Sequence, residues 1–91
     1  MSEVSQDIII PNKRGLHARA SAKFVAAVTE MQGHRVFVEK DGQEAAGGSI
    51  LGLMMLGAAM GDTVKIRVAG DDADAKLAEL VALVEGKFGE E

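Results

Sequence analysis

The chain has 91 residues, a net charge of −4, 47% hydrophobic residues, 26% charged residues and no cysteine. This size and composition predict one globular domain over residues 1–91, and they exclude a disulfide framework, a thiolate metal site and a mainly disordered chain. The acidic balance argues against a nucleic-acid partner. The acidic, polar N-terminal segment resembles neither a signal peptide nor a transit peptide, so we expect a cytoplasmic protein. His17 and His34 match no metal-ligand spacing, and we expect no metal and no cofactor.

The first part of the chain predicts two strands with a helix between them. Residues 8–10 form a β-branched run, which is typical of a strand. After a turn that ends at Gly15, apolar residues at helical spacing predict a helix over residues 18–31, and Gly33 marks its end. Residues 35–39 predict the second strand.

The middle of the chain predicts a hairpin followed by a short helix. Asp41-Gly42 favours a two-residue type I′ turn, because that turn needs positive φ angles, and residues 43–46 would pair back as the third strand. Ser49 is a good N-cap for a helix over residues 50–56. Residues 45–61 carry no charge, but they are too few and too rich in glycine for a membrane span, so we expect no membrane insertion.

The last part of the chain predicts a fourth strand and a third helix. Residues 63–68 alternate cleanly, and Asp71 and Asp72 crowd the start of the helix that follows, where the helix dipole favours anions. The apolar stripe of this helix consists of Ala73, Leu77, Leu80, Val81, Val84 and Phe88. Residues 89–91 are expected to fray. The order βαββαβα predicts an α+β fold in which an antiparallel sheet carries helices on one face.

The surroundings of His17 carry the strongest functional signal. The stretch from Ile8 to Thr29 contains no acidic residue and four basic ones, which are Lys13, Arg14, Arg19 and Lys23. If His17 caps the helix, the unpaired N–H groups and the positive end of the helix dipole would favour a phosphoryl group on its imidazole. Arg19 adds a charge-assisted donor. Spacing and charge alone leave open that His17 is a surface residue of a turn, which is also how we interpret His34.

Two motifs give the chain a resemblance to a known family. The first is Asn-Lys-Arg-Gly-Leu-His-Ala-Arg over residues 12–19, and the second is Ser-Ile-Leu-Gly-Leu-Met-Met-Leu-Gly-Ala over residues 49–58. In this order they resemble HPr, the histidine phosphocarrier family of the bacterial phosphotransferase system, and the resemblance runs from about Val4 to Phe88. It implies an open-faced β-sandwich, a four-stranded antiparallel sheet covered on one face by three helices.

The resemblance also implies a function and partners. His17 would accept a phosphoryl group on Nδ1 from enzyme I, which phosphoenolpyruvate feeds, and would pass it to IIA-type proteins of a sugar or nitrogen branch. Arg19 would stabilise the phosphoryl group, and the protein would act as a monomeric carrier rather than as an enzyme. The family usually has proline where this chain has Ala20. This difference concerns how rigidly the site is held rather than the identity of the acceptor. The alternative from the element order is a regulatory α/β-sandwich domain that senses a small molecule and needs no His17.

The second motif suggests regulation and docking. A serine at position 49 caps a helix whatever else it does, and the resemblance implies that an HPr kinase/phosphorylase phosphorylates Ser49 in some branches. The helix over residues 50–56 is too short to bury all its apolar side chains. If Leu53 and Leu56 face the core, an exposed patch remains, which would bind enzyme I and IIA-type proteins. That patch consists of Ile50, Leu51, Met54 and Met55. A wholly buried helix is the alternative.

Overall fold

A computed structural model describes residues 2–90 and contains one four-stranded antiparallel sheet. The strands are β1 (Ser2–Ile9), β2 (Arg35–Lys40), β3 (Gln43–Ala46) and β4 (Thr63–Gly70). Their order in the sheet is β1-β4-β2-β3, so β1 and β3 are the edges and β4 lies between the first two strands of the chain. Every neighbouring pair is antiparallel, as the sequence predicts.

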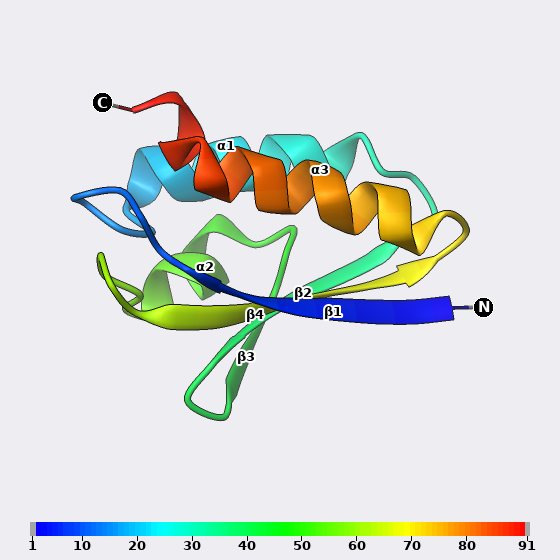
Figure 1. Ribbon diagram of the computed structural model, residues 1–91, viewed down its shortest axis with the longest axis horizontal. Helices are drawn as coiled ribbons and strands as arrows, with labels where there is room; N and C mark the ends of the chain where they lie inside the picture. The colour runs from blue at the N-terminus through cyan, green and yellow to red at the C-terminus, as the bar shows by residue number, and fades with distance from the viewer. Residues whose placement is uncertain (1, 91) are drawn as a thin grey trace.

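Three helices cover one face of this sheet and leave the other open, which confirms the predicted open-faced sandwich (Figure 1). They are α1 (Ala18–Thr29), α2 (Ile50–Met55) and α3 (Ala73–Glu85), and a short 3₁₀ turn, η1 (Lys87–Gly89), follows α3. In Figure 1, α1 and α3 run antiparallel to each other, so the end of α3 lies beside the start of α1.

The core lies between the helices and the covered face of the sheet. In β4, Val64, Ile66 and Val68 are buried while the residues between them are not, because successive side chains of a strand point to opposite faces. Leu53 of α2 and Leu80 of α3 are fully buried against this face. The alternation seen in the sequence therefore identifies the buried face correctly.

The first strand is longer than predicted. β1 begins at Ser2 and pairs with β4 from Ser2–Gly70 to Ile9–Thr63, whereas the sequence predicts a strand only from Ile8. Apart from Val4, which packs against the core, the extra residues are polar and pair through their backbone, so they give no run of apolar residues that predicts a strand. Ile10 was predicted as part of the strand but lies just after it, where it is buried and exchanges backbone hydrogen bonds with Gly61 and Asp62.

The turn and the helix ends agree with the sequence to within two residues. Asp41 and Gly42 both have positive φ angles, of 50° and 83°, which confirms the predicted hairpin turn. Gly33 also has a positive φ angle, of 82°, beyond the end of α1. Helix α1 ends at Thr29 rather than at residue 31, and α2 ends at Met55 rather than at residue 56.

The segment after α3 departs most from the prediction. The helix stops at Glu85, although the apolar stripe continues to Phe88. Lys87 and Phe88 both have left-handed backbone conformations, with φ of 58° and 54°, which turn the chain back and bury the Phe88 ring at 1% exposure. The expectation that residues 89–91 fray is wrong for Glu90, whose carboxylate contacts His17 and Asn12, while Glu91 lies outside the described residues.

Candidate functional site

The loop between β1 and α1 is closed by a buried asparagine. Asn12 is 1% exposed, and its side-chain Nδ2 donates a hydrogen bond of 2.8 Å to the Gly15 carbonyl oxygen. The Gly15 N–H donates in return to the Asn12 carbonyl oxygen at 3.2 Å. These two bonds form a tight turn over residues 12–15, which delivers the chain to the start of α1.

Glycine is required at position 15. Its φ angle is +62°, and a Cβ atom there would lie 2.2 Å from the Ala58 carbonyl oxygen. The same oxygen accepts a hydrogen bond of 3.0 Å from the Leu16 N–H. The loop after α2 therefore packs directly against the loop that precedes α1, and the two sequence motifs meet at this contact.

His17 is the N-cap residue of α1, as predicted. Its backbone is extended, with φ −76° and ψ −179°, and its carbonyl oxygen accepts the Ser21 N–H at 2.9 Å. Its ring Nδ1 accepts a hydrogen bond of 3.3 Å from the Arg19 N–H. An accepting nitrogen carries a lone pair, so this contact fits the form of the ring with its lone pair on Nδ1, at the positive end of the helix dipole.

The other ring nitrogen of His17 contacts an acidic residue that the sequence analysis missed. Nε2 is paired with Oε2 of Glu90, and both side chains are largely buried, at 19% and 17% exposure. Oε1 of the same carboxylate accepts a hydrogen bond of 3.1 Å from Asn12 Nδ2. The bond to His17 is the main cause that lowers the pKa of Glu90 below its ordinary value of 4.5, with smaller contributions from Asn12 and from the charge of Arg14. At neutral pH this carboxyl group is therefore ionised.

The predicted basic residues divide into two groups. Lys13, Arg14 and Arg19 are exposed around the loop. Arg19 contributes its backbone N–H to His17, and its side chain is exposed and makes no ion pair among residues 2–90. Lys23 has a structural contact instead, because its Nζ donates a hydrogen bond of 2.8 Å to the Phe88 carbonyl oxygen.

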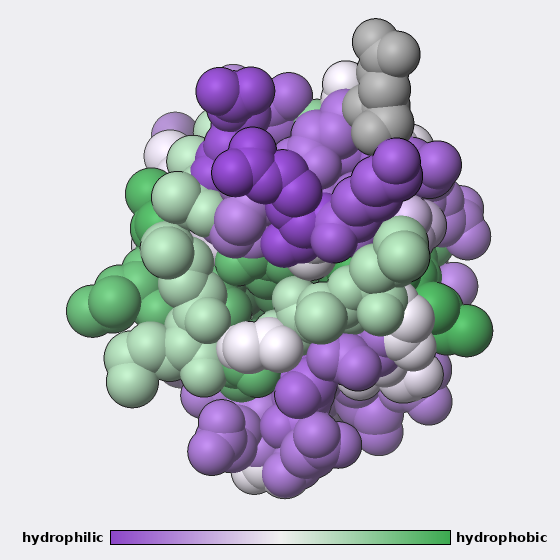
Figure 2. All heavy atoms as spheres, turned by 90° about the vertical axis from the view of Figure 1, so that its left-hand side faces the viewer, coloured by the Kyte–Doolittle hydropathy of each residue, from purple (hydrophilic) through white to green (hydrophobic). Residues whose placement is uncertain are grey.

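The apolar residues of α2 are exposed as the sequence predicts. Leu53 is fully buried and Leu56 is 7% exposed, so these two hold the helix to the core. The remaining four are exposed by 42%, 69%, 41% and 72% in the order Ile50, Leu51, Met54 and Met55. We call these four residues the α2 patch. Figure 2 shows an apolar band across this face of the molecule, with polar side chains on either side of it.

Ser49 is the N-cap of α2. Its Oγ accepts a hydrogen bond of 2.9 Å from the Gly52 N–H, and its own N–H donates to the Ala46 carbonyl oxygen at 3.1 Å. The side chain is half-buried. The predicted capping role is confirmed, and the structure shows no cation paired with this hydroxyl within the described part of the chain.

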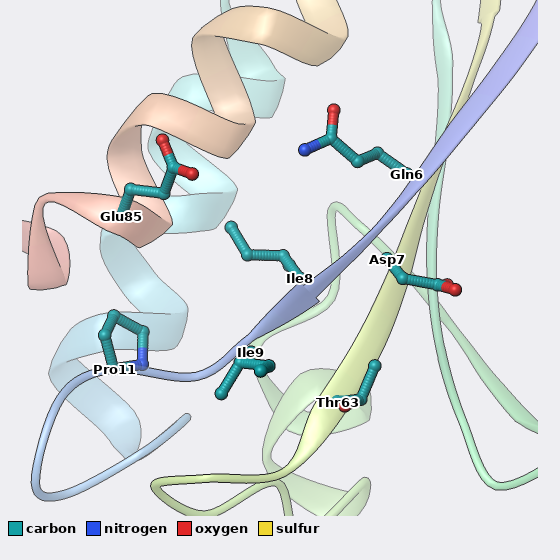
Figure 3. A pocket seen from close by; sticks show the side chains of 7 residues that line it. All are labelled: Gln6, Asp7, Ile8, Ile9, Pro11, Thr63 and Glu85. Atoms are coloured by element: carbon teal, nitrogen blue, oxygen red, sulfur yellow. The ribbon is translucent and has the colours of Figure 1, made fainter.

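Other kinds of site find little support between residues 2 and 90. That region contains no group of three metal-ligating side chains, and it holds no helix of the length and apolarity that a membrane span needs. A concavity lies at the β1 edge, where Gln6 and Glu85 project into it from opposite sides (Figure 3). It is lined by neither His17 nor Glu90, so the histidine site and this concavity are separate.

Comparisons with known proteins agree on one family. The family model described as "PTS HPr component phosphorylation site" matches residues 4–86. The chain is 39% identical to phosphocarrier protein NPr of Shewanella violacea, over 99% of this chain and 98% of that protein. It is 41% identical to phosphocarrier protein HPr of Neisseria meningitidis serogroup A, over 96% and 97%. A crystal structure of HPr from Thermoanaerobacter tengcongensis superposes with a TM-score of 0.87 at 44% identity, covering 100% of this chain and 99% of that one.

Proposed function

Because the chain belongs to the HPr family of phosphocarrier proteins of the phosphotransferase system, we propose that His17 is its phosphoryl acceptor and that the accepting atom is Nδ1. The protein is a carrier rather than a catalyst. It receives the phosphoryl group from phosphorylated enzyme I and passes it to a IIA-type protein. The observation that carries this proposal is the position of Nδ1, which accepts the Arg19 N–H at the N-terminus of α1.

The chemical step needs only a lone pair and stabilised negative charge. The Nδ1 lone pair forms a bond to phosphorus while the bond between phosphorus and the donor breaks and its electron pair returns to the donor. The phosphoryl oxygens then replace the ring as acceptors for the first N–H groups of α1, where the dipole favours an anion by roughly 0.3–1 kcal/mol at an exposed site. Phosphoryl transfer depends mainly on such positioning and charge stabilisation.

Arg19 is proposed to bind the phosphoryl oxygens. Its side chain is exposed and unpaired among residues 2–90, so it can turn toward Nδ1 without breaking an ion pair. The backbone N–H of Ala20 makes no hydrogen bond in the same part of the chain and adds a donor that the family's usual proline lacks. This departure therefore leaves the acceptor chemistry intact.

The α2 patch is proposed as the docking surface for both partners. The loop that follows α2 joins the acceptor loop through the hydrogen bond from the Leu16 N–H to the Ala58 carbonyl oxygen, which brings this end of α2 toward the acceptor loop. Exposed apolar residues in one patch mark protein-binding surfaces, and methionine adapts to more than one partner. A partner seated on α2 would place its own phosphoryl-bearing group next to His17.

Ser49 is proposed as a regulatory site for an HPr kinase/phosphorylase. Phosphorylation adds a charge of about −1.5 to −2 at the start of α2, which the helix dipole tolerates. The same charge beside the α2 patch would oppose docking of an apolar partner surface. Phosphopeptide mapping after treatment with the kinase tests this role, and a modified residue other than Ser49 would contradict it.

The acceptor role is tested with phosphoenolpyruvate and enzyme I. The wild-type protein should gain one phosphate that is acid-labile and base-stable. His17→Asn should gain none, although asparagine is a good N-cap and should keep α1 folded. His34→Ala, which removes the other histidine, should be phosphorylated like the wild type. Phosphate on His17→Asn would show that the acceptor lies elsewhere.

A further inference from the structure

We propose that Glu90 is a positioning residue for His17: its carboxylate holds the imidazole proton on Nε2, so that Nδ1 is the free nucleophile. This inference rests on the proposed acceptor role of His17. The match to the family model ends at residue 86, so Glu90 lies outside the matched segment. The contacts that Glu90 makes indicate its role.

The segment that carries Glu90 is held in place by several contacts. Phe88 is 1% exposed, and its carbonyl oxygen accepts the Lys23 Nζ at 2.8 Å. The Glu90 N–H donates to the Lys87 carbonyl oxygen at 2.8 Å. Lys87 and Phe88 are in the left-handed region, which L-residues adopt at a cost and only where surrounding contacts hold them. These contacts fix the backbone that brings Glu90 to the loop.

The carboxylate itself is oriented from two sides. One oxygen accepts the Asn12 side-chain N–H at 3.1 Å, and the other faces Nε2 of His17. Asn12 is buried and is also bonded to Gly15, so it does not move independently of the loop. Both oxygens of Glu90 therefore have a defined partner on the acceptor loop.

Two contacts select the same protonation form of His17. A neutral imidazole carries one N–H and one lone pair. Nδ1 accepts the Arg19 N–H and must present its lone pair, while Nε2 faces an ionised carboxylate and must present its proton. The tautomer with the proton on Nε2 satisfies both contacts, and the other tautomer satisfies neither.

This arrangement also suits the charge that develops during transfer. When the Nδ1 lone pair forms the bond to phosphorus, the ring keeps its Nε2 proton and becomes positively charged, and the carboxylate of Glu90 lies opposite that proton. When the phosphoryl group leaves, the electron pair of the nitrogen–phosphorus bond returns to Nδ1 and the ring is neutral again. No proton has to enter or leave the ring in either direction.

The test compares Glu90→Gln with Glu85→Gln. Both changes replace a carboxylate by an amide near the end of α3, but Glu85 projects into the concavity at the β1 edge and does not contact His17 (Figure 3). The first readout is the ¹⁵N chemical shifts of the His17 ring in the neutral form. Wild type and Glu85→Gln should carry the proton on Nε2. Glu90→Gln should show a measurable fraction on Nδ1, because an amide can pair with either tautomer.

The second readout is the rate of phosphoryl transfer from enzyme I. Loss of the carboxylate that orients a metal-bound histidine lowers activity by about tenfold or more, and by analogy we expect a decrease of about tenfold for Glu90→Gln only. Unchanged ring shifts together with an unchanged rate in Glu90→Gln would overturn the inference while leaving His17 as acceptor. A wild-type protein that accepts no phosphate would overturn the proposed function instead, and the ring shifts would still decide whether Glu90 positions the proton.

Discussion

The acceptor loop, residues 12–17, contacts the loop that follows helix α2, but the acceptor loop and the helix are held in different ways. The loop is fixed by Asn12, by the close approach of Gly15 to Ala58 and by Glu90. Helix α2 has one capped end and two buried leucines, and the rest of its surface is exposed. The loop must place one nitrogen atom accurately, whereas the helix must fit several partner surfaces. The difference suggests that the chemistry depends on a fixed loop and the docking on an adaptable helix.

The largest expected effect comes from the two leucines on opposite sides of α2. Leu53→Ala should lower the free energy of unfolding by about 2–5 kcal/mol, because Leu53 is fully buried. Leu51→Glu should change it by less than about 0.5 kcal/mol, because Leu51 is 69% exposed, yet it should weaken binding to enzyme I and to IIA-type proteins. Thermal unfolding and titration calorimetry measure both. A large loss of stability in Leu51→Glu would show that the α2 patch belongs to the core.

The next largest effect is a loss of stability when the acceptor loop is changed. Gly15→Ala should destabilise the protein by roughly 2–3 kcal/mol, because the residue has a positive φ angle and its new Cβ would overlap a backbone oxygen. Gly57→Ala is the control, since it also has a positive φ angle but meets no atom within 4 Å. Denaturant unfolding of both variants separates the overlap from the backbone conformation. Equal losses would show that the contact between the loop and Ala58 contributes nothing.

A smaller effect is expected at the cap of α2. Ser49→Ala removes the acceptor of the Gly52 N–H and should cost about 1 kcal/mol. Ser49→Asp keeps a capping oxygen and should cost less, but its charge should weaken docking in the same direction as phosphorylation. Comparing unfolding curves with binding affinities distinguishes the two roles of this residue. If Ser49→Asp binds enzyme I as tightly as the wild type, charge at this cap does not regulate docking.

The smallest effect is a local response to acid. The pKa of Glu90 is lowered, so its contacts stabilise the folded segment fully above 4.5 and are lost as the pH falls through the lowered value. The protection of the Glu90 amide against hydrogen exchange, which is the intrinsic rate divided by the observed rate, should therefore fall below pH 4.5. Glu90→Gln should lack this transition. An identical pH response in the variant would assign it to another group.

Most of the fold and part of the site follow from local patterns. The cap at His17, the cap at Ser49, the hairpin turn and the exposed α2 patch each depend on neighbouring residues, and the sequence predicts all four. Glu90 could not be found in this way, because 73 residues separate it from His17 and a glutamate near a chain end normally indicates solvent. The only signal was Phe88, whose place in the apolar stripe indicated that the chain stays packed beyond α3.

The length of β1 and the contact of Lys23 could not be predicted either, and the physical reason is the same. The segment from Ser2 to Asp7 pairs in β1 with a strand that is distant in sequence, and the single apolar residue Val4 among polar neighbours is too weak a pattern to predict that strand. Lys23 was counted among the four basic residues around His17, but its ammonium is bonded to the Phe88 carbonyl oxygen. Both cases depend on contacts that form only when distant parts of the chain meet.

The central claim is that Nδ1 of His17 accepts the phosphoryl group while Nε2 stays paired with Glu90. The most direct test is NMR spectroscopy of the protein labelled with ¹⁵N in histidine, recorded after phosphorylation by enzyme I and phosphoenolpyruvate. The account predicts a ³¹P–¹⁵N coupling to Nδ1 of His17 and a proton on its Nε2. A coupling to Nε2, or to a nitrogen of His34, would contradict it.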